Sequence, residues 1–226
     1  MLAVQSWPGP VSLGATASGV AANPIVFGIA TPDTSIRDTA RELARQALRE
    51  VLGVLLDRTP ETVPLASQPG HPIRLDIPGL HAGLSVSHEP GLTIAAIHLA
   101  GEVGVDLMRV EQDPDWWSDW EMLARDYLGP QASDRIARQS STQRVRAFVR
   151  EWTRFEASLK CLAMPLQEWS PALDHDLMRC RLFDLDVPNG FIGSLAVYLD
   201  DRISDHQIRG EGTFHMRVGF NLDRAM

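Results

Sequence analysis

The sequence predicts an α+β protein made of two similar halves. Two observations support this prediction. Residues with helical hydrophobic spacing are followed by short strand-like runs, and the same order of helix and strands recurs in the second half of the chain. No internal sequence repeat accompanies the recurring order. The boundary falls near residues 100 to 103, so the predicted halves are residues 1–102 and residues 103–226.

Composition and charge argue against several classes of protein. The chain has 226 residues, 44% of them hydrophobic, which is enough for a proper core. Its net charge of -8 argues against nonspecific nucleic-acid binding, which needs a basic surface. The two cysteines, Cys161 and Cys180, form no disulfide framework and no metal-type spacing, which favours a reducing, cytoplasmic compartment. The first residues lack the basic stretch of a signal peptide, and no run of about eighteen apolar residues occurs, so we expect no membrane partner.

The first half begins with a loose segment, residues 1–32, that is rich in small residues and proline. One strand is predicted within it, at residues 24–29. A helix is predicted over residues 35–52, because apolar residues recur there at helical spacing. Ser35 is its expected N-cap and Gly53 its expected end.

Three strands are predicted to follow this helix. The first two, residues 83–88 and 92–99, are joined by a turn at residues 89–91. The third, residues 102–110, completes a three-stranded set. Alternation along the third strand places Val103, Val105 and Leu107 on one face and Gly104, Asp106 and Met108 on the other.

The second half is predicted to repeat helices followed by strands. Its predicted helices are residues 116–127 and 141–163, and its predicted strands are residues 180–185, 191–199 and 213–218. Together with the first half, this order indicates a pseudo-dimer of two α+β units.

Lys160 is the only lysine among the 21 basic residues, and it follows Glu156 by one helical turn. Glu156 falls near the middle of an apolar stripe, so the sequence predicts a buried carboxylate that needs a cation, a metal ion or strong donors. Lys160 reaches the same space with a compact charge suited to phosphate. The alternative is an ordinary surface pair between helix residues four apart. The stripe consists of Val145, Phe148, Val149, Trp152, Leu159 and Ala163.

Asp106, on the third predicted strand, is a second carboxylate in an apolar segment that needs a compensating partner. If its carboxylate converges with that of Glu156, the two would form a site for a hard cation. Mg²⁺ takes one or two carboxylates together with phosphate oxygens and water. The alternative is that Asp106 only ends the strand or caps a neighbouring element.

Three motifs occur in order along this part of the chain. Ser85-Val-Ser87-His88 is similar to the pattern N-x-S-H-S. Gly104-Val-Asp106-Leu-Met108 resembles G-[IV]-D-x-[DE], and about fifty residues later Trp152-Thr-Arg-Phe-Glu156-Ala-Ser-Leu-Lys160 resembles W-[ST]-x-K-E-[AS]-x-x-K. These are signatures of the Sfp-type 4'-phosphopantetheinyl transferases, in the holo-acyl-carrier-protein synthase superfamily. The resemblance covers roughly residues 35 to 200.

The resemblance implies a pseudo-twofold fold, with helices packed on a small antiparallel sheet in each half, that binds coenzyme A between the halves. It also implies a reaction: the 4'-phosphopantetheine arm of coenzyme A passes to a serine of an apo acyl, peptidyl or aryl carrier protein, and 3',5'-ADP is released. Asp106 and Glu156 would hold Mg²⁺ on the pyrophosphate. Glu156 would assist in removing the serine proton, and Lys160 would bind the phosphate under attack.

The resemblance also implies residues for coenzyme A itself. Ser87 and His88 would contact its 3'-phosphate, and Arg41 of the first helix would join them. His71, in Gly70-His71-Pro72, takes the position of a lysine in the family and would belong to the same set.

Several positions depart from the family pattern. Met108 stands where the family has a second acid, and a thioether is a poor Mg²⁺ ligand, so the metal would have two protein ligands and additional water. Phe155 replaces a lysine before Glu156, and Gln131 replaces an acid. Because these changes leave fewer charges around coenzyme A, a second interpretation stays open. It is a catalytically impaired module, on the same fold, that binds a carrier protein or coenzyme A.

A basic surface is predicted on the helix that carries Glu156. Carrier proteins are commonly acidic, so this surface is a candidate docking site, with a solvated helix face as the alternative. It consists of Arg146, Arg150 and Arg154, with Arg135 and Arg138 just before. Trp116, Trp117 and Trp120 would offer the partner an apolar anchor, although core packing is expected for at least one of them. An internal pseudo-dimer makes a monomer the expected state.

Overall fold

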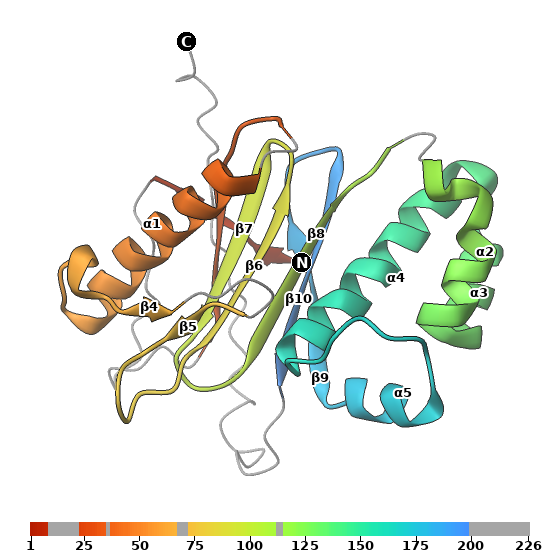
Figure 1. The fold of residues 1–226 in the computed structure, drawn as a ribbon. Coiled ribbons are helices and arrows are strands. Elements are labelled where there is room, and N and C mark those ends of the chain that lie inside the picture. The colour runs from red at the N-terminus through yellow and green to blue at the C-terminus, as the bar shows by residue number, and fades with distance from the viewer. Residues whose placement is uncertain (9–22, 35–36, 67–71, 112–114, 199–226) are drawn as a thin grey trace.

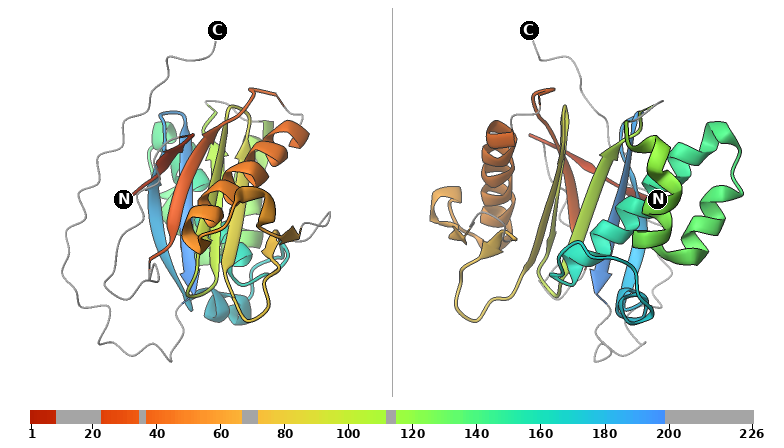
Figure 2. Two further views of the ribbon diagram at one scale, coloured as in Figure 1. Left: turned by 90° about the vertical axis from the view of Figure 1, so that its left-hand side faces the viewer. Right: turned by 45° about the vertical axis from the view of Figure 1, so that its right-hand side comes forward.

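The computed structural model describes residues 1–8, 23–34, 37–66, 72–111 and 115–198. Two four-stranded sheets face one another at the centre of the molecule (Figure 1). Helix α1 covers one outer side and helix α4 covers the other, and both views in Figure 2 show the same layers. The α+β class predicted from the sequence is confirmed.

The first sheet has the strand order β2-β3-β7-β6. Its three long strands are antiparallel, and β2 pairs with β3 in parallel. The strands are β2 (Gln5–Trp7), β3 (Ile25–Ala30), β6 (Gly83–Glu89) and β7 (Leu92–His98). Each of the three longer strands begins and ends within one residue of its predicted position. The outer face of this sheet packs against helix α1 (Arg37–Leu56) through a continuous apolar core.

The second sheet has the strand order β1-β9-β10-β8. Strands β8 and β9 pair antiparallel with the central β10, and β1 pairs with β9 in parallel. The strands are β1 (Leu2–Ala3), β8 (Val103–Arg109), β9 (Cys180–Asp186) and β10 (Phe191–Tyr198). The outer face of this sheet packs against helix α4 (Ser141–Cys161).

The prediction that β8 completes one sheet with β6 and β7 is wrong. β8 pairs with β10, and its other edge lies over the inner face of β6. Along most of its length that face carries small side chains, at Gly83, Ser85 and Ser87, and only its last residue, Glu89, is large. A Cβ atom at Gly83 would lie 2.4 Å from the carbonyl oxygen of Gly101 and 2.8 Å from the nitrogen of Val103. The small residues of β6 therefore make room for the backbone that enters the second sheet.

The two sheets share one connection order. In each, a strand is followed by a long helix and then by two further strands, and the last strand takes the middle position. The two sets are β3, α1, β6, β7 and β8, α4, β9, β10. The chain passes from the first set to the second between His98 and Val103.

The N-terminal residues join both sheets, although the sequence predicts a loose segment there. β1 belongs to the second sheet and β2 to the first, so the chain crosses between the sheets within a few residues. Val4, at the crossing, is 2% exposed and packs in the core between the sheets. Strands this short are not long enough to show an alternation of apolar and polar residues, so the hydrophobic pattern of the sequence did not predict them.

Helix α1 ends later than predicted. It continues through Gly53 to Leu56, and Asp57 follows with a positive φ of 52°. The amide of Arg58 then donates to the carbonyl of Gly53 at 2.8 Å. The expected N-cap, Ser35, lies outside the described residues.

The remaining elements are short. The predicted helix at residues 116–127 is helical but is divided into η2 (Asp115–Asp119), α2 (Trp120–Leu123) and the π-helical η3 (Ala124–Leu128). The others are η1 (Pro60–Thr62), β4 (Leu65–Ala66), β5 (Arg74–Leu75), α3 (Gly129–Ala137) and α5 (Pro171–Leu177). The strand predicted at residues 213–218 lies outside the described part of the chain. Among the described residues, no helix is both long enough and apolar enough to cross a bilayer.

Candidate functional site

Asp106 lies in the middle of β8, not at its end. Val103, Val105 and Leu107 fill the core between the two sheets. Because side chains alternate along a strand, Asp106 must project from the opposite face, which is covered by α4. The alternative that Asp106 only ends the strand is therefore excluded.

Helix α4 approaches β8 closely at Gly104. A Cβ atom at this position would lie 2.0 Å from the carbonyl oxygen of Ala157 and 2.5 Å from the nitrogen of Cys161. Only a residue without a side chain permits this approach. The contact fixes the height and distance at which the residues of the last two turns of α4 face Asp106.

The burial of α4 differs from the single stripe predicted from the sequence. The helix is covered by β8 and β10, by the short helices before it and by α5, so its buried residues surround it on several sides. Glu156 is not buried in the middle of a stripe: its side chain is 30% exposed. Ala163 is exposed and lies beyond the end of the helix. The buried residues are Phe148, Val149, Thr153, Phe155, Ala157, Ser158, Leu159 and Cys161.

Side chains from two other elements converge on one oxygen atom of Asp106. The Lys160 ammonium, from α4, lies 2.6 Å from Asp106 Oδ1, and the Ser87 hydroxyl, from β6, donates to the same atom at 2.9 Å. Lys160 Nζ also lies 4.0 Å from Glu156 Oε2. The closer partner of Lys160 is thus Asp106 and not the residue four positions before it. One ammonium stands between the two carboxylates.

Glu156 is held by its own donor. The indole Nε1 of Trp152 donates to Glu156 Oε1 at 2.8 Å. Trp152 is in turn fixed by a stacked contact with Phe148 and a tilted contact with Tyr127. The sequence placed Trp152 in the apolar stripe and at the start of a motif but predicted no hydrogen bond for it, although its position one turn before Glu156 was the signal for this contact.

Burial dominates the electrostatics of Asp106. The pKa of this carboxyl is raised from 3.8 to about 6, with loss of hydration as the largest cause. The Lys160 ammonium acts against that rise, the negative charge of Glu156 adds to it, and the Ser87 hydrogen bond opposes it. A second cation beside Asp106 would favour the ionised form further.

The two carboxylates fit the donor set of a magnesium ion that also binds phosphate. Asp106 Oδ2 makes no hydrogen bond to any described residue, and Glu156 Oε2 faces Lys160. Mg²⁺ commonly takes one or two carboxylates and keeps several waters or phosphate oxygens. No group of three or more histidine, cysteine or acidic side chains within the described ranges is arranged to hold a metal. Met108, on the same face as Asp106, adds no oxygen ligand.

Two comparisons with known proteins gave no match. A scan of the sequence against protein-family models found no family, and a search of curated proteins found no relative.

The structure does not bring all the predicted coenzyme-binding residues to this cluster. Ser87 belongs to it, but His88 projects from the opposite face of β6, where its Nδ1 lies 2.8 Å from Thr93 Oγ1. Arg41 lies on the outer helix α1 and pairs with Asp38 at 3.4 Å. His71 lies outside the described residues.

The predicted basic surface is partly neutralised within the chain. Arg154 and Arg150 pair with Asp184 of β9, and Arg135 pairs with Glu151. The side chain of Arg146 is exposed. Trp120 is buried and stacks on Trp117, so the expected core role of at least one tryptophan is confirmed.

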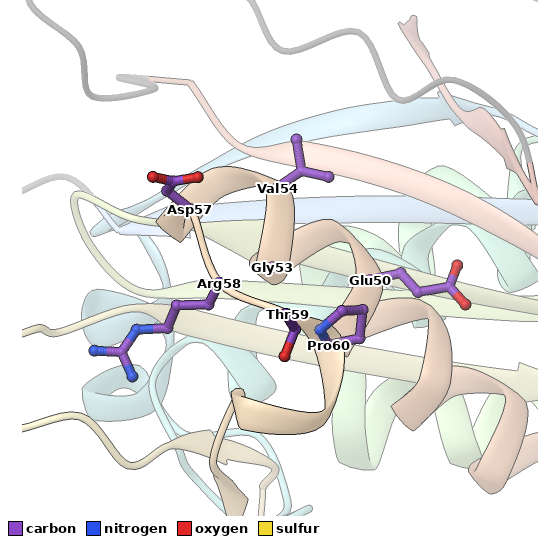
Figure 3. A pocket seen from close by; sticks show the side chains of 7 residues that line it. All are labelled: Glu50, Gly53, Val54, Asp57, Arg58, Thr59 and Pro60. Carbon is purple, nitrogen blue, oxygen red and sulfur yellow. The ribbon is translucent and has the colours of Figure 1, made fainter.

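A surface hollow lies far from this cluster, at the C-terminal end of α1 (Figure 3). None of the predicted site residues lines it. Val54 at its rim is 70% exposed, and the charged side chains of Asp57 and Arg58 extend toward solvent. It is lined by Glu50, Gly53, Val54, Asp57, Arg58, Thr59 and Pro60. The residues that line this hollow include no cluster of charged side chains comparable with that around Asp106.

Proposed function

We propose that the protein is a 4'-phosphopantetheinyl transferase that modifies a serine of an apo carrier protein with the phosphopantetheine arm of coenzyme A. The observation that carries the proposal is the convergence of Asp106, Glu156 and Lys160, from a strand and a helix, around one ammonium. These residues stand at the positions of two signature motifs. The shared connection order of the two sheets supports the pseudo-twofold fold that the proposal includes.

The reaction requires neutralisation of a diphosphate and removal of one proton. The serine oxygen forms a bond to the phosphorus that bears pantetheine, the bond from that phosphorus to the bridging oxygen breaks, and 3',5'-ADP leaves with that oxygen. A bound Mg²⁺ supplies electrostatic stabilisation of the diphosphate oxygens. The other contributions come from side chains of this chain.

Each side chain of the cluster has a distinct task in this proposal. Asp106 and Glu156 provide the carboxylate oxygens for the cation, and Lys160 binds a phosphate oxygen as a compact charge. For Lys160 to do so, its ammonium moves from Asp106 Oδ1 toward the substrate. Glu156, whose Oε1 is fixed by Trp152, accepts the serine proton directly or through one water.

The proposal is tested by intact mass spectrometry. The protein is incubated with coenzyme A, Mg²⁺ and a panel of apo carrier proteins from fatty-acid, polyketide and peptide synthesis. We expect one phosphopantetheine mass increment on at least one carrier, lost when Glu156 is replaced in Glu156→Ala. Glu151→Ala, which changes an acid on the same helix outside the cluster, is the matched control and should retain transfer.

A second candidate function is a binding module without catalysis. It is favoured by Met108, which supplies no second oxygen ligand, and by Phe155, whose ring is buried against Leu159 and Leu173 where the family carries a lysine. Coenzyme A binding without transfer to any carrier of the panel would support this module and would contradict the transferase.

A further inference from the structure

We propose that Ser87 is a positioning residue for the cation site and not a ligand of the coenzyme. This inference rests on the proposed function, because it assigns a role to Ser87 within the same site. The Ser87 hydroxyl orients the Asp106 carboxylate by holding Oδ1, which leaves Oδ2 for a divalent cation.

The hydrogen bonds of Ser87 are all made within the protein. Its hydroxyl donates its one hydrogen to Asp106 Oδ1 at 2.9 Å and accepts from the amide of Leu107 at 3.1 Å. The Lys160 ammonium lies 3.4 Å from Ser87 Oγ. A hydroxyl has one hydrogen and two lone pairs, so this set uses its full capacity. With 6% of the residue exposed, no donor remains for a phosphate.

The position of Ser87 on β6 leads to the same assignment. Ser87 faces β8, whereas His88 faces the α1 side of the sheet, because neighbouring residues of a strand project to opposite faces. The two side chains therefore do not form one phosphate-binding pair.

The consequence for Asp106 concerns its two oxygen atoms. Oδ1 is held by both Ser87 and Lys160, while Oδ2 makes no hydrogen bond to any described residue. Oδ2 is also not among the enclosed, unpaired atoms found in the described residues, which are Thr31 Oγ1, His98 Nδ1 and Arg144 Nε. A carboxylate fixed through one oxygen presents the other in a set direction, as the outer partners of metal ligands commonly arrange. When Lys160 moves to the substrate, Ser87 is the partner that keeps Asp106 in place.

Ser85 provides a matched control within the same strand. Its hydroxyl accepts from the amide of Val105 at 2.9 Å, two residues before the equivalent bond of Ser87, and the residue is 7% exposed. No carboxylate of the described residues is hydrogen-bonded to Ser85. Substitution of either serine removes one hydrogen bond from a backbone amide of β8 to β6, but only substitution of Ser87 also removes the hydrogen bond that holds Asp106.

The test measures the affinity of Mn²⁺, as a paramagnetic probe for the Mg²⁺ site, by electron paramagnetic resonance without coenzyme A. We expect Ser87→Ala to weaken Mn²⁺ binding about tenfold relative to wild type, as for other changes to the partners of metal ligands. Ser85→Ala should stay within about twofold of wild type, and Ser87→Thr, which keeps the hydroxyl, should restore most of the affinity. Coenzyme A affinity, measured by calorimetry in EDTA, should be equal in Ser87→Ala and Ser85→Ala.

The outcomes distinguish this inference from the proposed function. If Ser87→Ala and Ser85→Ala bind Mn²⁺ alike, or if Ser87→Ala selectively loses coenzyme A affinity in EDTA, the positioning role is overturned while the transferase stands. If the wild-type protein binds no Mn²⁺ without coenzyme A, the positioning role is overturned, while the mass-spectrometric transfer assay decides the proposed function separately. Should Ser87→Ala not fold, Ser87→Cys keeps the size with a weaker donor, and an unchanged Mn²⁺ affinity in that variant contradicts the role.

Discussion

At the scale of single residues, Lys160 combines two properties that explain why a lysine stands here in an arginine-rich chain. Its ammonium is compact enough to lie 2.6 Å from one carboxylate and 4.0 Å from another. With a side chain 34% exposed, it remains open to a substrate. A guanidinium is planar and wider, with fixed donor directions, so it does not occupy the same point between two acids.

Lys160→Arg is therefore expected to preserve charge and stability but lose function. Transfer to the carrier protein should fall at least about tenfold, while the melting temperature changes by less than about 3 °C. Steady-state transfer and thermal unfolding measure the two quantities. Wild-type turnover in this variant would limit Lys160 to a structural ion pair with Asp106.

Asp106 should make the stability of the metal-free protein depend on pH in an unusual direction. Its pKa is about 6 in the folded state, above the ordinary 3.8, so the folded state binds more protons than the unfolded state between these values. The contribution of this residue is therefore complete below about pH 4 and is lost as the pH rises through 6. Urea unfolding in EDTA should show that wild type loses free energy of unfolding relative to Asp106→Asn across this interval. A constant difference between the two proteins from pH 4 to pH 7 would contradict the raised pKa.

The sequence predicted the members of the cluster but not its geometry. Asp106, Glu156 and Lys160 were identifiable because charged residues are rare in apolar segments. The predicted burial of Glu156 was wrong, because the prediction assumed a single apolar stripe for a helix that packs on several sides. The contact from Ser87 depends on the stacking of β8 over β6, which no local pattern encodes.

At the scale of elements, the distance between β8 and α4 decides whether the cluster forms. Gly104 permits backbone contact between them, and the side chains of Asp106 and Lys160 meet because of it. The contact ties a strand of the second sheet to the last two turns of the helix.

Gly104→Ala is expected to force α4 away from β8 and to destabilise the protein by more than about 3 kcal/mol, since the added methyl meets backbone atoms that cannot rotate away. Gly193→Ala is the control, because its methyl would meet only side-chain atoms, the nearest at 3.3 Å. That variant should lose less than about 1 kcal/mol. Chemical unfolding of both proteins gives the comparison, and equal losses would refute the packing argument.

Elements with long, regular patterns were predictable and short ones were not. Helix α4 ends within two residues of its predicted end, because five turns of hydrophobic spacing define it. Helix α5 was missed although Ser170 accepts a hydrogen bond from the amide of Leu173 as its N-cap and Pro171 begins the helix, signals that are visible in the sequence. The pairing of β8 depended on tertiary contacts, so spacing alone led to the wrong sheet.

At the scale of the whole molecule, the two sheets share one core and should unfold together. Val4 lies in that core although it is distant in sequence from most of its neighbours. Val4→Ala is expected to reduce the free energy of unfolding by about 2 kcal/mol in one cooperative transition. Val54→Ala, at a position 70% exposed, is the matched control and should be close to neutral. Separate transitions for the two halves would contradict a shared core.

The pairing of β1 with β9 also constrains the order of events during synthesis. Leu2 and Ala3 are synthesised long before their partners Leu185 and Asp186. N-terminal units of larger proteins commonly fold while the rest of the chain is still being translated. Here β1 must wait until β9 has been synthesised before it finds its place, so the second sheet is completed late relative to the synthesis of its first strand.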